Sequence, residues 1–94
     1  MKLEIHYTKS FKKSLKRVRQ YPGFKIQKFR NVIELLQCGA VLPVQYRDHG
    51  LTGDMAGYRE CHLAPDILLI YQIDNEILTL VLTNIGTHAS LFDK

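Results

Sequence analysis

The first twenty residues alternate between apolar and polar positions in two different periods. Leu3, Ile5 and Tyr7 alternate with polar neighbours, which is typical of a short strand with one buried face. From residue 9 to residue 20 the apolar positions recur at helical spacing, and Thr8 is placed to cap that helix. The apolar stripe of this helix consists of Phe11, Leu15 and Val18. Because the stripe is narrow, we expect the helix to lie on the surface of a larger layer.

A second helix is predicted over residues 24–38, after a break at Pro22 and Gly23. Gly39 is a suitable residue to end it, because glycine adopts the left-handed conformation without steric cost. The apolar face of this helix consists of Ile26, Phe29, Val32, Ile33 and Leu36. The two helices together are expected to form a hairpin.

The remainder of the chain predicts a loop followed by a three-stranded meander. Residues 40–55 are irregular and contain proline, glycine and a polar tract, as functional loops often do. Strands are predicted over 56–63, 67–71 and 77–83, with turns at Ala64-Pro65-Asp66 and at Asp74-Asn75. The middle strand is almost continuously apolar, so we expect both of its faces to be covered. Residues 86–92 are expected to form a short helical turn.

The predicted order is β-α-α-β-β-β, an α+β fold in which the helical hairpin covers one face of an antiparallel sheet. A length of 94 residues corresponds to one domain, residues 1–94, with a composition of 46% hydrophobic and 23% charged residues that is typical of globular proteins. No apolar run is long enough to cross a bilayer, and residues 1–6 do not have the pattern of a secretory signal. Cys38 and Cys61 lack metal-ligand spacing and are expected to be free thiols in the cytoplasm.

Charge is distributed very unevenly along the chain. The net charge is +4, yet residues 1–30 hold ten of the thirteen lysines and arginines and a single acid, Glu4. A basic segment of this density attracts polyanions and speeds encounter with nucleic acid. A solvated helix face that maintains solubility is the simpler alternative interpretation.

Four residues at the edges of predicted elements could carry chemistry. His49 lies in the loop, His62 ends the first strand of the meander, Asp66 lies in the following turn, and His88 follows the last strand. Cleavage of RNA through its 2′-hydroxyl needs a base, an acid and positive charge near the phosphate. Histidines titrate near neutrality and, with a carboxylate to orient one of them, can supply these functions without a metal. Because His62 and Asp66 flank one turn, Asp66 is expected to orient His62. We therefore expect no metal and no other cofactor.

Simpler interpretations of the same residues stay open. Single histidines at strand ends are commonly hydrogen-bonded surface residues, and aspartate after proline is a common turn residue. A zinc site of His62, Asp66 and His88 is conceivable, but no closely spaced His or Cys pair anchors it. His6, on the first strand, is expected to be structural.

Four pieces of the chain, in order, resemble one family. They are Tyr46-Arg47-Asp48-His49, Gly57-Tyr58-Arg59-Glu60-Cys61-His62, Pro65-Asp66 before Leu68-Leu69-Ile70-Tyr71, and Gly86-Thr87-His88-Ala89-Ser90-Leu91-Phe92. Together they resemble the RelE/ParE superfamily of bacterial toxins, most closely the YafQ-type mRNA interferases. The resemblance covers nearly the whole chain, because the β-α-α-β-β-β order also agrees with that fold.

The resemblance implies a metal-independent ribonuclease that cuts mRNA on the ribosome and is held inactive by a cognate antitoxin protein. It assigns catalytic roles to His49, His62, Asp66 and His88. Phe92 corresponds to an aromatic residue near the scissile nucleotide, and Arg59 is expected to contact the substrate.

The chain departs from the family pattern at two positions. Asn84 stands where the family usually has an arginine, and Ile67 stands where close relatives often have tryptophan. Losing the arginine removes a cation that would stabilise phosphate charge in the transition state, so Asn84 is expected to face the substrate without supplying that charge.

Two other functions compete with the ribonuclease. One is a non-catalytic toxin of the same fold that binds a protein target such as gyrase, but such a binder has no need of three histidines and an aspartate. The other is a plain RNA-binding module that uses the basic helices, for which charge would matter and His88 would not.

Overall fold

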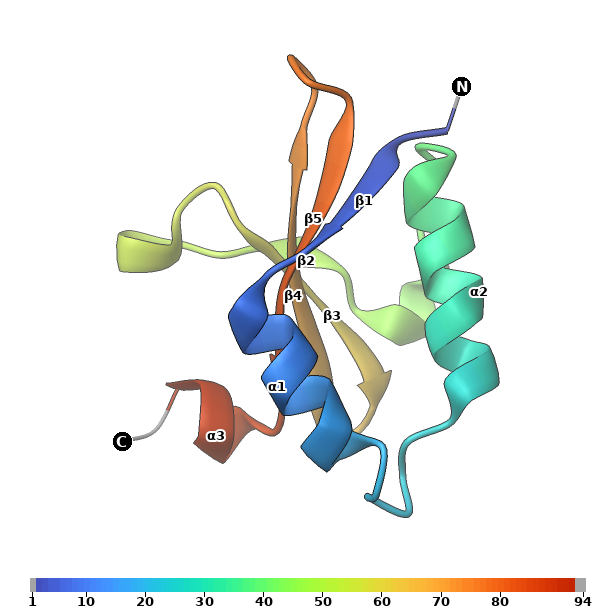
Figure 1. Ribbon diagram of the computed structural model, residues 1–94, viewed down its shortest axis with the longest axis vertical. Helices are drawn as coiled ribbons and strands as arrows, with labels where there is room; N and C mark the ends of the chain where they lie inside the picture. Colours follow the sequence, from blue (N-terminus) through green and yellow to red (C-terminus); the bar gives the residue numbers. More distant parts are fainter. Residues whose placement is uncertain (1, 93–94) are drawn as a thin grey trace.

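The computed structural model describes residues 2–92 and has the predicted α+β architecture (Figure 1). Its elements are, in order, β1 (Glu4–Tyr7), α1 (Lys9–Val18), α2 (Ile26–Gln37), the 3-10 helix η1 (Val44–Tyr46), β2 (His49–Gly50), the 3-10 helix η2 (Gly53–Met55), β3 (Arg59–Ala64), β4 (Ile67–Asp74), β5 (Thr79–Gly86) and α3 (His88–Phe92). Among the helices of residues 2–92, none is long and apolar enough to span a membrane.

Local sequence signals set the ends of the two long helices. The Thr8 hydroxyl accepts a hydrogen bond from the Phe11 backbone N–H at 3.0 Å, which confirms the predicted cap. Gly39 has φ +73°, and the N–H groups of Gly39 and Ala40 donate to the carbonyls of Leu36 and Leu35. This is a Schellman motif, and it ends α2 at the predicted glycine.

The sheet has the strand order β1-β5-β4-β3-β2. The predicted meander is confirmed, since β3, β4 and β5 pair antiparallel. The expectation of a wholly antiparallel sheet is wrong at one edge, because β1 pairs parallel with β5, with Glu4 opposite Thr79. The connection between β1 and β5 contains both helices and the strands β2, β3 and β4, and this length permits the parallel arrangement.

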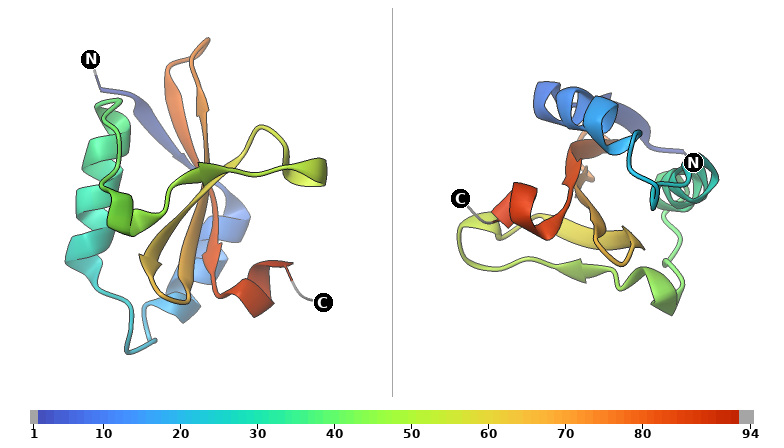
Figure 2. Two further views of the ribbon diagram at one scale, coloured as in Figure 1. Left: turned by 180° about the vertical axis from the view of Figure 1, so that it is seen from behind. Right: turned by 90° about the horizontal axis from the view of Figure 1, so that it is seen from below.

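The two faces of the sheet have different roles. One face carries Cys61, Leu69, Tyr71 and Leu82, which join the hydrophobic core beneath the helices. Figure 1 shows α1 crossing this face in front of β4 and β5, and the view from below in Figure 2 shows α1 and the edge strand β2 on opposite sides of the molecule. The packing of helices against the first face leaves the second face free for the polar residues of β3.

Several predicted boundaries differ from the structure, and both long helices are shorter than predicted. The segment read as a loop contains β2 and two short 3-10 helices, because His49 pairs with Glu60 of β3 and extends the sheet. The first meander strand begins at Arg59 rather than at residue 56. The turn after β4 spans residues 75–78 with Leu78 at φ +51°, and Asp74 Oδ1 accepts the N–H groups of Glu76 and Ile77.

Candidate active site

Strand register places the candidate polar residues in rows on the face opposite the helices. Glu60 of β3 lies opposite His49 of β2 and opposite Ile70 of β4, and Ile70 in turn lies opposite Asn84 of β5. Directly paired residues project to the same face, so these four form one row across the sheet. The next row contains His62, Leu68 and Gly86. Buried Leu68 and Ile70 therefore form an apolar floor between the polar side chains.

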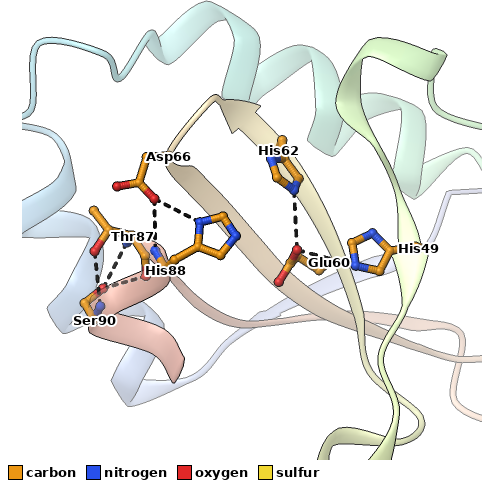
Figure 3. A network of polar contacts seen from close by, with 7 residues as sticks. All are labelled: His49, Glu60, His62, Asp66, Thr87, His88 and Ser90. Atoms are coloured by element: carbon orange, nitrogen blue, oxygen red, sulfur yellow. Dashed lines mark hydrogen bonds and ion pairs between the residues drawn. The ribbon is translucent and has the colours of Figure 1, made fainter. Parts of the chain in front are cut away.

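His88 is fixed by Asp66 from the β3–β4 turn. Its ring Nδ1 lies 3.0 Å from Asp66 Oδ1, and its backbone N–H donates to the same oxygen at 3.1 Å (Figure 3). A carboxylate only accepts, so the Nδ1 proton lies on the Asp66 side and Nε2 is left for other contacts. These hydrogen bonds from His88 hold the pKa of the Asp66 carboxyl below its usual value.

The helix that presents His88 is held by its own first turn. Thr87 Oγ1 accepts the Ser90 N–H at 3.1 Å, and Ser90 Oγ accepts the Thr87 N–H at 2.9 Å. This reciprocal pair is a capping box, with serine in place of the more usual glutamate. A Cβ added at Gly86 would clash with Ser90 Oγ, so a larger residue there would displace the hydroxyl that caps α3.

A second carboxylate, Glu60, lies between two histidines. Glu60 Oε1 is 3.4 Å from His62 Nε2 and 3.5 Å from His49 Nε2. Glu60 is only 5% exposed, and buried carboxylates need such partners. The other ring nitrogen of His49, Nδ1, donates to the Arg47 carbonyl at 2.7 Å, so both nitrogens of this imidazole are engaged.

The two histidine–carboxylate pairs face each other across the sheet surface. The rings of His62 and His88 have centroids 5.8 Å apart, edge to face, and Phe92 lies beyond His88 at a centroid distance of 6.4 Å (Figure 3 for the histidines). Two imidazoles at this separation, each with its own carboxylate, can serve as a proton donor and a proton acceptor for one bound phosphodiester. The four sequence-predicted residues His49, His62, Asp66 and His88 are thus brought to one face.

The structure pairs the carboxylates and histidines differently from the sequence-based expectation. Asp66 was expected to orient His62, because the two flank one turn. The structure instead pairs Asp66 with His88 and pairs His62 with Glu60. Sequence reasoning missed Glu60, although strand alternation places residues 60 and 62 on the same face of β3, and an acid two residues before a candidate histidine was the available signal.

Asn84 and Arg59 have different positions relative to this face. Asn84 lies in the row of Glu60 and Ile70, although its Oδ1 accepts a hydrogen bond from the Ile85 N–H at 2.9 Å. Arg59 lies on the opposite face of β3 from Glu60 and His62. Its guanidinium pairs with Asp48 at 3.1 Å, so the structure does not bring Arg59 into the histidine cluster. Its expected contact with the substrate stays a prediction.

Asp48 ties the active-site loop to the core. It accepts hydrogen bonds from Arg59 and from the hydroxyl of Tyr71, whose ring is buried under the helices. The Asp48 carboxylate raises the pKa of the Arg59 guanidinium, while burial, with Asp48 adding to it, raises the pKa of Tyr71. Since His49 follows Asp48 directly, this anchor sets where the loop presents His49.

The same cluster contains the donor atoms of a possible metal site. Glu60, His62 and His88 each offer a ligand atom, and these atoms lie within 4.8 Å of one another. Two imidazoles and a carboxylate are a donor set that zinc accepts. Asp66, considered from the sequence, is replaced by Glu60 in this set. The spacing of residues along the chain could not show it, because α3 and β3 meet only in the fold.

Comparisons with known proteins place the chain in a family. Residues 3–93 match the family described as "Bacterial toxin of type II toxin-antitoxin system, YafQ". The chain is 36% identical over 90 residues to the mRNA interferase toxin YafQ of Escherichia coli (strain K12), covering 95% of each chain.

Solved structures show the same fold. A metal-bound toxin from Helicobacter pylori superposes with a TM-score of 0.88 at 40% identity, covering 96% of this chain and 99% of that one. The toxin of the E. coli DinJ-YafQ toxin-antitoxin complex superposes with a TM-score of 0.84 at 32% identity, covering 98% and 99%. The resemblance seen in the sequence motifs is therefore confirmed, and the chain belongs to the YafQ family of bacterial toxins of type II toxin–antitoxin systems.

Proposed function

We propose that this toxin is an endoribonuclease that cleaves mRNA on the ribosome by metal-independent acid–base catalysis. The observation that carries the proposal is that the ring centroids of His62 and His88 lie 5.8 Å apart, with each ring paired with a separate carboxylate. The mRNA interferase name of the E. coli relative, 36% identical to this chain, supports RNA as the substrate. Since its target would be translating ribosomes, the toxin would act in the cytoplasm.

The reaction needs two proton transfers, and the site has a group for each. One imidazole takes the proton of the 2′-hydroxyl, whose oxygen attacks the adjacent phosphorus. The bond from phosphorus to the 5′-oxygen breaks, and the other imidazole protonates that oxygen as it leaves. His88 suits the first role, because its Nδ1 proton is held by Asp66 and its Nε2 has no hydrogen-bond partner among residues 2–92. His62 then serves as the acid.

His49 and Phe92 complete the substrate side of the proposal. His49 belongs to the β2 segment and is half exposed, so it can move toward RNA once its contact with Glu60 is released. Phe92 is 41% exposed beside His88, where its ring offers a base a surface on which to stack. The products would carry a 2′,3′-cyclic phosphate and a 5′-hydroxyl.

The proposed partners are the ribosome and a neutralising antitoxin protein. Helix α1 carries four exposed basic residues, Lys12, Lys13, Lys16 and Arg17. Their positive charge is suited to ribosomal RNA phosphates. The E. coli relative forms a complex with the DinJ antitoxin, which supports an antitoxin partner for this chain as well.

The test uses toxin purified away from any antitoxin and ribosomes programmed with a defined mRNA. Cleavage should persist in EDTA in a buffer where polyamines keep the ribosome intact. The products should end in 2′,3′-cyclic phosphate or 3′-phosphate, detected by their resistance to ligation until phosphatase and kinase treatment. Cleavage abolished by EDTA, restored by a divalent ion and yielding 3′-hydroxyl ends would contradict the proposal.

A further inference from the structure

A pocket that is lined in part by His62, but not by His88, opens on the surface. It has a volume of about 280 Å³ and lies between α2, η1 and the end of β3. Its polar lining includes Lys28, Gln45, Arg47 and His62. The size is near the lower end of small-molecule sites, roughly 300 Å³, so it suits one phosphate–ribose unit rather than a whole metabolite.

Positive charge dominates the lining of this pocket. Two cationic side chains from separate elements, Lys28 of α2 and Arg47 after η1, line it, and no carboxylate of residues 2–92 does. Within residues 2–92, neither cation forms an ion pair with an acid of the chain. Cations that are not neutralised inside a concave site favour an anion there.

Arg47 is held in an unusual conformation that connects the pocket to the histidine cluster. Its φ is +50°, in the left-handed region that non-glycine residues rarely adopt. Its N–H donates to the Val44 carbonyl at 3.0 Å, and its own carbonyl accepts the Nδ1 proton of His49 at 2.7 Å. One residue therefore positions His49 through its backbone and turns its side chain to the pocket that contains His62.

We infer that this pocket, defined by Lys28, Arg47 and His62, binds an RNA phosphate one step along the strand from the phosphate that is cut. The inference rests on the proposed function, because His62 is shared between the pocket and the cleavage site. A strand whose scissile phosphate lies between His62 and His88 would pass over His62 and place its neighbouring phosphate between the two cations. The pocket thus fixes the register of the RNA.

A contact with a phosphate that does not react is made equally in the ground state and in the transition state. Its loss should raise KM and leave kcat unchanged, unlike the loss of a proton-transfer group. Lys28→Gln and Arg47→Gln should each raise KM for ribosome-bound mRNA by roughly 10-fold, as expected for a charged hydrogen bond. Lys28→Arg and Arg47→Lys should restore most of the binding, and His62→Ala should lower kcat instead.

The experiment compares these variants with Lys25→Gln, a cation at the start of the same helix that does not line the pocket. Each protein is checked for folding by circular dichroism. The mRNA carries a neutral methylphosphonate in place of one phosphate at a time on either side of the cut. The parent and Lys25→Gln should be slowed by the modification at one flanking position, which assigns the phosphate in the pocket. The Lys28→Gln/Arg47→Gln double variant should be insensitive at that position.

Two results would overturn the inference in distinguishable ways. If the parent cuts mRNA but the double variant has the same KM as Lys25→Gln, or keeps the same sensitivity to the modification, the pocket does not bind this phosphate and the proposed ribonuclease is unaffected. If the parent does not cut mRNA at all, the proposed function fails and the inference fails with it.

Discussion

His88 is bonded twice to one oxygen of Asp66, through its ring Nδ1 at 3.0 Å and through its backbone N–H at 3.1 Å. Both hydrogen bonds join His88 of α3 to Asp66, which lies in a turn 22 positions earlier in the chain. Together they fix both the position and the ring orientation of His88. The ionised form of Asp66 accepts both bonds, and its pKa is lowered by them. The stabilisation from this pair is therefore present at neutral pH and is lost only as the pH falls through the lowered pKa.

Removal of the histidines tests which residues carry the reaction. His88→Ala and His62→Ala should each reduce cleavage by about 10²- to 10⁴-fold, because a proton-transfer group is lost. Asp66→Ala should reduce it less, since the imidazole remains. Growth arrest and mRNA cleavage are measured together, with circular dichroism to verify folding. If both folded histidine variants cut as fast as the parent, a toxin that only binds its target becomes the better account.

Glu60 is expected to position His62 rather than to touch the RNA. Glu60→Gln keeps the shape and one acceptor but removes the charge that pairs with His62 and His49. Loss of a hydrogen bond to a charged group costs roughly 1.5–3 kcal/mol, so kcat should fall by about 10- to 150-fold. The alkaline limb of the kcat–pH profile, which reports the acid His62, should also shift relative to the parent. An unchanged profile with unchanged kcat would remove Glu60 from the mechanism.

Asn84→Arg tests whether the missing family cation can be restored. Asn84 lies in the same cross-strand row as Glu60, on the face of the histidines. A guanidinium there would stabilise phosphate charge in the transition state, so cleavage should be preserved or raised. Asn84→Lys and Asn84→Gln serve as the matched charged and neutral controls. A folded Asn84→Arg protein with lower activity than Asn84→Gln would show that this side chain does not face the reacting phosphate.

The Asp48 anchor should contribute to stability. Asp48→Ala removes the acceptor of the buried Tyr71 hydroxyl and the partner of Arg59, and should lower the free energy of unfolding by about 1–3 kcal/mol. Tyr71→Phe should cost less, because it removes both the donor and the need for the acceptor. Urea denaturation measures both, and the double variant gives their coupling. The control is Asp54→Ala, an exposed acid of η2, expected within about 0.5 kcal/mol of the parent.

The two thiols should differ sharply in reactivity. Burial, with Asp48 and Glu60 adding to it, raises the pKa of Cys61 to about 12, whereas Cys38 is exposed. The thiolate is the reactive form, so at pH 8 an aromatic disulfide reagent should modify Cys38 at least ~100-fold faster than Cys61. In denaturant both should react. The Cys38→Ser protein isolates Cys61, and rapid labelling of this variant while folded would contradict the buried position of Cys61.

Signals that act over a few residues were readable from the sequence. Thr8 caps α1, Gly39 ends α2, and the apolar run from Ile67 to Tyr71 is a central strand buried on both faces, all as predicted. Each depends on groups three to five positions apart or on a simple alternation, so the local pattern is sufficient to determine it. The motifs also sufficed to identify the family, and they indicated His49, His62, Asp66 and His88 as candidate residues.

Only the tertiary structure decided how these residues combine. The parallel pairing of β1 with β5 and the pairing of His49 with β3 join segments that are distant in sequence. The same holds for the contact of Asp66 with His88, which leaves Glu60 as the partner of His62. Such pairings depend on which faces the register brings together and on where buried charge finds a partner. The local sequence around a residue does not show which distant segment will lie beside it in the fold. Proximity along the chain therefore suggested His62 as the partner of Asp66, whereas the fold brings His88 to it.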